Sequence, residues 1–235
     1  MIKVSSIAKQ TSFGILRANA KPEQLTGMAR FAIQTDQRLG LSIPDLRRIA
    51  KQVPHEHQLA LDLWESGIPD ARLLASMIDV PEQATEEQLE AWVKDFNSWD
   101  ICDQVCDNLF QHTSFAWDKV REWSTREEEF VKRAAYALIC CLAWHDKNAS
   151  DQQFINLFPV IQAGASDPRN FVKKAVNWAL RNIGKRNLAL NQAAIAQANK
   201  LLTLCDKTAN WIARDALREL QNEKTQARVA KHPRG

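Results

Sequence analysis

The sequence predicts an all-α fold built from a repeated pair of helices. One short segment recurs along the chain: FVKRAAYAL begins at Phe130, FVKKAVNWAL at Phe171 and WIARDALREL at Trp211, so successive copies start 41 and 40 residues apart. A weaker relative, ARLLASMI, begins at Ala71. Strand signals are nearly absent, because alternation of β-branched residues is rare and the Asn-Gly and Asp-Gly hairpin turns do not occur.

The apolar residues of each copy follow the helical period. In the second copy they form one stripe at i, i+3, i+4, i+7 and i+11, made of Val172, Ala175, Val176, Ala179 and Ile183. The first copy repeats this stripe with Val131, Ala134, Ala135, Leu138 and Leu142. A second apolar-periodic segment precedes each copy, such as FINLFPVIQAG before the second. Two helices per unit of about 40 residues indicate a curved α-solenoid of HEAT-like repeats with a basic concave face.

We expect a single HEAT-like repeat domain over residues 1–220, with paired antiparallel helices from residue 25 onward. A chain of 235 residues fits one large domain or two small ones, and no linker in it is long enough to separate two domains. After Leu220 the segment QNEKTQARVAKHPRG loses the apolar period. Residues 221–235 are therefore expected to form a frayed or disordered tail.

Composition and cysteine usage predict a soluble cytoplasmic protein. Hydrophobic residues make up 45% of the chain, and no apolar run approaches the roughly 20 residues of a membrane span. The N-terminus lacks the apolar stretch of a secretory signal, and the five cysteines lack the spacing of a disulfide framework. Cys102 and Cys106, with His112 nearby, could belong to a metal site, but zinc needs four ligands, and buried reduced thiols fit better. We expect no metal and no cofactor.

Basic charge is concentrated in the C-terminal part of the chain. Residues 166–235 hold 14 Lys and Arg against 5 Asp and Glu, a net charge of +9, whereas residues 1–165 have a net charge of −6. Solvated helix faces are often basic, but this asymmetry favours a polyanion as partner. A Gly-rich phosphate loop, a GxSxG motif and a paired catalytic histidine are all missing, so nucleotide hydrolysis and serine-type chemistry are unsupported.

The helix predicted from Phe171 carries a basic stripe away from its apolar one. Its members, spaced at i, i+4, i+7 and i+11, are Lys174, Trp178, Arg181 and Lys185. Basic residues bind phosphates while a tryptophan ring packs on a sugar or a base. The alternative is that Trp178 packs against the adjacent repeat.

The same repeat position is basic in the other copies. Arg133 occupies it in the first copy and Arg214 in the third, where Arg218 follows one turn later. Stacked in register, these helices would line one surface with cations at intervals of a helix spacing, roughly 10 Å. The phosphates of a DNA duplex could follow such a track, and arginine can bind each phosphate through two hydrogen bonds.

The segment NSWDICDQVCDNLF, residues 97–110, holds a second notable group. Trp99 and Asp103 are four residues apart, so they share one face of a helix, away from the core stripe of Ile101, Cys102, Val105 and Leu109. Asp103 either pairs with Arg133 as a structural salt bridge or stabilises a cation formed in a reaction, and spacing alone favours the salt bridge. Asp100 is interpreted as a residue of the helix N-terminus, with Ser98 as its candidate cap.

Taken in order, these motifs resemble the bacterial AlkD-like DNA alkylation repair proteins, which are HEAT-like-repeat alkylpurine DNA glycosylases. The resemblance covers residues 22–220, nearly the whole ordered chain. It begins with MARF at residues 28–31 and LGLSIPDLRRIAK at residues 39–51, and continues through SWDICDQV, FVKRAA and FVKKAVNWALR.

The resemblance implies roles for individual residues. Trp99 and Trp178 match the family's two active-site tryptophans, and Asp103 its catalytic aspartate. Phe31, also expected to contact DNA, stands where well-studied members carry tyrosine, so the hydroxyl is missing and we expect contact through the ring alone. The residues expected to contact DNA are Arg133 and Arg181, matched by motif, and Lys174 and Arg214, placed by the repeat register.

The implied reaction suits these residues. A purine alkylated at N3 or N7 is cationic and leaves readily, and its departure produces an oxocarbenium-like sugar of the kind that carboxylates stabilise in glycosidases. We therefore expect a monomeric glycosylase acting on duplex DNA with alkylated bases. The alternatives are a non-catalytic HEAT-repeat protein that binds damaged or branched DNA and, less well supported, a protein-interaction scaffold. Trp99, Asp103 and Trp178 together favour the enzyme over both.

Overall fold

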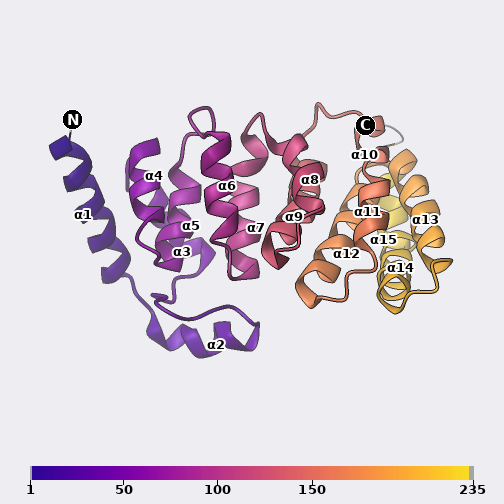
Figure 1. The fold of residues 1–235 in the computed structure, drawn as a ribbon, viewed down its shortest axis with the longest axis horizontal. Coiled ribbons are helices and arrows are strands. Elements are labelled where there is room, and N and C mark those ends of the chain that lie inside the picture. Colours follow the sequence, from indigo (N-terminus) through magenta and orange to yellow (C-terminus); the bar gives the residue numbers. More distant parts are fainter. Residues whose placement is uncertain (1, 233–235) are drawn as a thin grey trace. The chain divides into compact units, whose positions relative to one another are not determined.

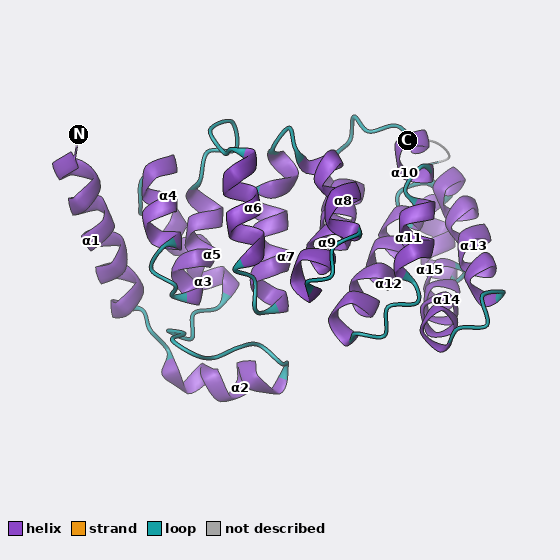
Figure 2. Cartoon of the chain, in the orientation of Figure 1, coloured by secondary structure: helices purple, strands orange, loops and turns teal. Residues whose placement is uncertain are grey.

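The computed structural model describes residues 2–232, and within that range the chain forms helices and loops with no strand (Figure 2), as the sequence predicts. Figure 1 labels the helices in chain order. The chain divides into two compact units, Met1–Phe115 and Ala116–Gly235. No helix among the described residues is both long enough and apolar enough to cross a membrane.

The first unit is organised around α5, which contains the ARLLASMI segment. Helix α5 packs against α3, α4 and α7, and Leu73, Leu74 and Ile78 on it are fully or almost fully buried. Trp64 of α4 stacks on Trp92 of α6, with ring centroids 3.9 Å apart. The helices of this unit are α1 (Ile2–Ala18), α2 (Leu25–Arg30), α3 (Ile43–Ala50), α4 (His57–Trp64), α5 (Pro69–Ile78), α6 (Glu86–Lys94) and α7 (Trp99–Asn108), with short 3-10 turns at Pro22–Gln24 and Phe110–His112.

The second unit contains the three sequence repeats, which form α9, α12 and α14. Helix α12 packs against both α9 and α14, so the three copies are stacked in chain order. Four of the other helices of this unit pack against this row: α8 against α9, α11 and α13 against α12, and α13 and α15 against α14, whereas α10 packs against α13. The bounds are α8 (Ala116–Ser124), α9 (Glu129–His145), α10 (Asp151–Ile155), α11 (Phe158–Gly164), α12 (Asn170–Gly184), α13 (Leu188–Leu202), α14 (Lys207–Leu220) and α15 (Glu223–Val229).

The apolar stripes predicted for the first two copies form the core between these helices. All ten of their residues are buried, with at most 2% of each exposed. Six alanines on the facing sides of α9, α12 and α14 are also fully buried, and their small side chains let neighbouring helices approach closely. They are Ala134, Ala135, Ala175, Ala179, Ala213 and Ala216.

The C-terminal segment is the main difference from the predicted secondary structure. The prediction of a frayed tail is wrong for residues 223–229, which form α15 and pack against α13 and α14. The side chain of Asn222 caps this helix by accepting a hydrogen bond from the Thr225 backbone N–H at 2.8 Å. Only Thr225 and Val229, one turn apart, are buried, which is too few positions to show a helical period in the sequence. Residues 233–235 lie outside the described range.

Candidate nucleic-acid interface

Trp99 and Phe31 are brought together in the first unit. Trp99 is the first residue of α7, and its indole Nε1 donates a hydrogen bond of 2.9 Å to the backbone carbonyl of Phe31. Phe31 immediately follows α2, where carbonyl groups lack helical partners, so the indole satisfies one of them. The Phe31 ring itself points outward and is 72% exposed. Two residues that the sequence analysis singled out in separate motifs are thus neighbours.

A buried ion pair fixes the loop that carries Phe31. Arg38 Nη2 donates to Asp100 Oδ2 at 2.6 Å, with 2% and 11% of the two side chains exposed. Arg38 Nε also donates to the carbonyl of Gln34, and the hydroxyl of Ser98 accepts from the Gln34 N–H and donates to Asp100. Ser98 is the N-cap residue of α7, as predicted, but its side chain makes this loop contact and no cap hydrogen bond.

The far end of the same loop is fixed by Asp70. Its buried carboxylate accepts hydrogen bonds from the N–H groups of Leu39 and Leu41, at 2.8 and 2.9 Å. Gly40 between them has φ of +80°, and a Cβ there would lie 2.2 Å from the carbonyl oxygen of Lys21. Only glycine fits this position. The loop from residue 31 to residue 41 is therefore held in one conformation relative to α7.

Asp103 lies one turn after Trp99 on α7. The predicted core stripe of this helix is confirmed, since Ile101, Cys102 and Val105 are at most 1% exposed. Asp103 is half-buried and off that stripe. Its carboxylate and the Trp99 ring therefore belong to the same face of α7, which begins beside the Phe31 loop.

Ion pairs neutralise part of the basic stripe predicted on α12. Arg181 Nη1 donates to Glu219 Oε2 at 2.5 Å, and Lys185 Nζ donates to Glu219 Oε1 at 2.7 Å. Burial raises the pKa of Glu219, but the Lys185 hydrogen bond and the two cations outweigh it and hold that pKa below its ordinary value. Asp215, one turn earlier on α14, lies 3.4 Å from Arg181. Neither carboxylate was predicted from the sequence, although their i, i+4 spacing on the third repeat indicates a second charged stripe.

Positive charge remains at Lys174, in the other half of the α12 stripe, and at Arg214, in the middle of α14. Lys174 and Arg214 are exposed and make no ion pair with any residue in the range 2–232. Trp178, between Lys174 and Arg181 on α12, is half-buried.

The predicted surface position of Arg133 is wrong. Arg133 is only 6% exposed, and its Nη1 donates to the backbone carbonyl of Phe171 at 2.7 Å. This position on α9 faces the first turn of α12, so the guanidinium links two stacked repeats. It does not line an exposed track.

The candidate residues fall into two groups, one in each unit. The first unit holds Phe31, Trp99 and Asp103, and the second holds Lys174, Trp178, Arg181 and Arg214, with Arg133 beneath the surface. The described residues include no cluster of three or more His, Cys, Asp or Glu that could bind a metal, and Cys102 and Cys106 are buried.

Comparison with solved structures defines the class of fold. One structure matches with a TM-score of 0.73 and 17% sequence identity, over 94% of this chain and 95% of the other. That structure is described as "A new family of proteins related to the HEAT-like repeat DNA glycosylases with affinity for branched DNA structures". A designed armadillo repeat protein in complex with a peptide matches at a TM-score of only 0.36, with 16% identity over 88% of this chain and 85% of the other. The molecule is therefore a HEAT-like helical-repeat protein.

The family follows from the sequence itself. Residues 15–228 match the family described as DNA alkylation repair enzyme. The chain belongs to that family, which confirms the resemblance drawn from its motifs. A search of curated proteins gives no significant match.

Proposed function

We propose that the protein is a DNA glycosylase that hydrolyses the N-glycosidic bond of cationic N3- and N7-alkylated purines in duplex DNA. One observation carries the proposal: Trp99 is fixed by the Phe31 carbonyl on a loop that the Arg38–Asp100 pair holds in place, and Asp103 lies one turn along the same helix. Such an arrangement is pre-organised, as catalysis by electrostatic stabilisation requires. Membership of a family of DNA alkylation repair enzymes supports it.

The reaction needs stabilisation of a cationic sugar. Alkylation gives the purine a positive charge, so the bond to the sugar breaks with departure of a neutral base and leaves an oxocarbenium-like sugar. The carboxylate of Asp103 stabilises that cation and orients the attacking water. The electron-rich face of Trp99 contacts the sugar and the charged base, and Trp178, which belongs to the second unit, contributes an aromatic contact to the DNA. The exposed Phe31 ring contributes a contact to the DNA beside Trp99.

The phosphate contacts are assigned according to exposure. Lys174 and Arg214 bind phosphates directly, because both are exposed and carry unpaired charge among the described residues. Arg181 binds one by exchanging Glu219 for the phosphate. Arg133 supports the DNA-facing helices from below. The protein acts as a cytoplasmic monomer in this proposal.

The decisive experiment replaces the carboxylate of Asp103. Asp103→Asn should lower single-turnover excision of 7-methylguanine from duplex DNA by on the order of 10²-fold, the usual cost of removing one well-placed electrostatic stabiliser. DNA binding should persist or improve, since a negative charge is removed near phosphates. Asp107→Asn, one turn further along α7, is the matched control and should leave excision within about twofold, because the asparagine amide oxygen can still accept the hydrogen bond that Gln111 donates to Asp107.

Melting temperatures measured on the same preparations separate catalysis from structure. If Asp103 serves as a structural salt-bridge partner, Asp103→Asn melts at a lower temperature while its excision rate per folded molecule stays unchanged. A stable Asp103→Asn variant with full excision refutes the catalytic assignment.

A second candidate function is non-catalytic binding of damaged or branched DNA. Two observations favour it: the similar solved structure is described by affinity for branched DNA, and Glu219 neutralises two cations of the expected duplex track. Wild-type protein that binds a four-way DNA junction tightly but excises no methylated base would establish this function instead.

A further inference from the structure

We propose that the exposed face of α14 binds a single-stranded stretch of DNA, with the Trp211 ring stacked on an unpaired base and nearby cations on the flanking phosphates. The inference rests on the proposed DNA binding and adds to it a contact that recognises unpaired nucleotides. The cations are Lys173, Lys207, Arg214 and Arg218.

The repeat register explains why Trp211 is exposed. Phe130, Phe171 and Trp211 occupy the same position in the three copies. Phe130 and Phe171 pack on each other, with ring centroids 5.3 Å apart, and both are half-buried. Trp211, the equivalent residue of the third copy, is instead 42% exposed. Exposure of a large aromatic ring to water is unfavourable, because its apolar area stays unburied. Such exposed rings are typical of binding surfaces.

A cation lies over one face of the Trp211 ring. The ammonium group of Lys173, from α12, is 4.8 Å from the ring centroid. This contact holds the ring in place by a cation–π interaction and brings positive charge beside it. A base stacked on the remaining exposed part of the ring would place its phosphate within reach of that charge.

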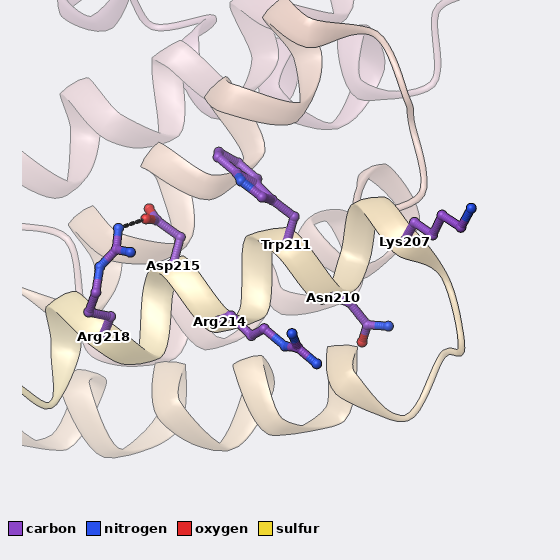
Figure 3. A pocket seen from close by; sticks show the side chains of 6 residues that line it. All are labelled: Lys207, Asn210, Trp211, Arg214, Asp215 and Arg218. Carbon is purple, nitrogen blue, oxygen red and sulfur yellow. Dashed lines mark hydrogen bonds and ion pairs between the residues drawn. The ribbon is translucent and has the colours of Figure 1, made fainter.

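The surface around Trp211 is a shallow pocket of about 340 Å³ (Figure 3). Figure 3 shows its side chains leaving successive turns of α14, with Trp211 and Arg214 between Lys207 at one end and Arg218 at the other. Asn210 adds an amide that can bond to the edge of a base. Besides Trp211, the lining consists of Lys207, Asn210, Arg214, Asp215 and Arg218.

The charge of this pocket is positive despite Asp215. The Asp215 carboxylate accepts a hydrogen bond of 2.6 Å from Asn177 and pairs with Arg218 and, at 3.4 Å, with Arg181. Lys207 and Arg214 are exposed and make no ion pair with any residue in the range 2–232. An aromatic platform next to unpaired cations is the arrangement by which proteins bind single strands. Paired bases in a duplex offer edges and no free face, so the occupant must be unpaired.

The test compares a forked DNA with a duplex. The probes are a fluorescein-labelled fork with two oligothymidine arms and a fully paired duplex of equal length, with binding measured by fluorescence anisotropy. Trp211→Ala should weaken fork binding by about tenfold, as expected for loss of one base–aromatic stack, and change duplex binding by less than about twofold. Trp211→Phe should restore most of the fork affinity, because phenylalanine also stacks.

Trp144 provides a matched control. Its ring is 55% exposed and Arg228 lies over it, with the guanidinium carbon 5.7 Å from the centroid. Trp144→Ala should leave fork and duplex binding unchanged, and melting temperatures of all three variants should confirm that they are folded.

The outcomes distinguish this inference from the proposed catalytic function. Fork binding that is unchanged in Trp211→Ala, or reduced equally on fork and duplex, overturns the inference, as does a wild-type protein that shows no preference for the fork. Excision from a duplex lesion should remain intact in Trp211→Ala. A normal fork preference together with full excision by Asp103→Asn would instead defeat the catalytic proposal and leave this one standing.

Discussion

Helices α9 and α14 are copies of the same sequence repeat, but the arginine at one equivalent position is buried in α9 and exposed in α14. Arg133 and Arg214 each stand three residues after the aromatic residue that opens the motif. Arg133 is 6% exposed and bonded to the Phe171 carbonyl, whereas Arg214 is exposed on the face of α14. The difference follows from packing, because the first turn of α12 covers Arg133 of α9, whereas the helices packed against α14 leave Arg214 exposed. Position in the stack decides whether a repeat cation is structural or available to a ligand.

The neighbouring repeat positions show the same contrast. Lys132 of α9 pairs with Asp167 at 3.5 Å and is half-buried. Its counterpart on α12, Lys173, lies over the exposed Trp211 ring. Similar side chains therefore link α9 to the loop before α12 in the first copy and border an open surface beside the third.

Replacing Arg133 should have the largest effect among these variants, a fall in the free energy of unfolding. Arg133→Ala removes a buried side chain and leaves the Phe171 carbonyl without its guanidinium partner, so the free energy of unfolding should fall by about 2–4 kcal/mol. Arg133→Met, which keeps the packing of the alkyl chain, should lose less. Urea denaturation at pH 7 measures both. If Arg133→Ala is as stable as wild type but binds DNA more weakly, the structural assignment is wrong and Arg133 contacts a phosphate.

Replacing Arg214 should affect binding and spare the fold. Arg214→Ala should change the free energy of unfolding by less than about 0.5 kcal/mol, since the side chain is an exposed surface group. The slope of log affinity against log salt for DNA should become shallower by about 0.9, which corresponds to one lost phosphate contact. Titrations at four salt concentrations with wild type in parallel measure this slope. An unaltered slope would remove Arg214 from the interface.

Replacing Glu219 should give the smallest effect and test the neutralised part of the α12 stripe. Glu219→Gln releases Arg181 and Lys185, so affinity for duplex DNA should rise roughly two- to fivefold at low salt. Weaker binding by this variant would mean that Glu219 positions those cations for DNA.

The same variant gives a stability signature that depends on pH. The pKa of Glu219 in the folded protein lies below its ordinary value of 4.5, so the charged form stabilises the fold above about that pH. This contribution is lost as the pH falls through the lowered pKa. Wild type should therefore be slightly more stable than Glu219→Gln at pH 7, and the two should converge in acid. Denaturation midpoints at pH 7 and pH 3 check the sign.

Much of the fold was predictable because repeats and helical periods are local properties of the sequence. The copies at Phe130, Phe171 and Trp211 and their apolar stripes predicted α9, α12 and α14 and the faces they bury. Helix α15 was not predictable in this way, since a helix that buries only Thr225 and Val229 shows no period. The boundary between the two compact units left no linker signature in the sequence.

The candidate site was predictable residue by residue but not as an arrangement. The motifs identified Phe31, Trp99 and Asp103, yet nothing in them indicated that the Trp99 indole bonds to the Phe31 carbonyl or that Arg38 pairs with Asp100. Those partners are 68 and 62 residues apart in the chain, so only folding brings them together. The same applies to Glu219, which neutralises Arg181 from a different repeat.

The sequence by itself determined the helical class, the repeat register, the family and the residue types available for DNA contact, because each of these is encoded in spacing along one chain. The tertiary structure decided which of those side chains reach solvent. Arg133, Arg181 and Arg214 share a repeat motif, but packing against the next helix buries the first, a carboxylate from another helix pairs with the second, and the third stays exposed. Burial and ion pairing depend on neighbours in space, which the linear spacing of residues does not specify.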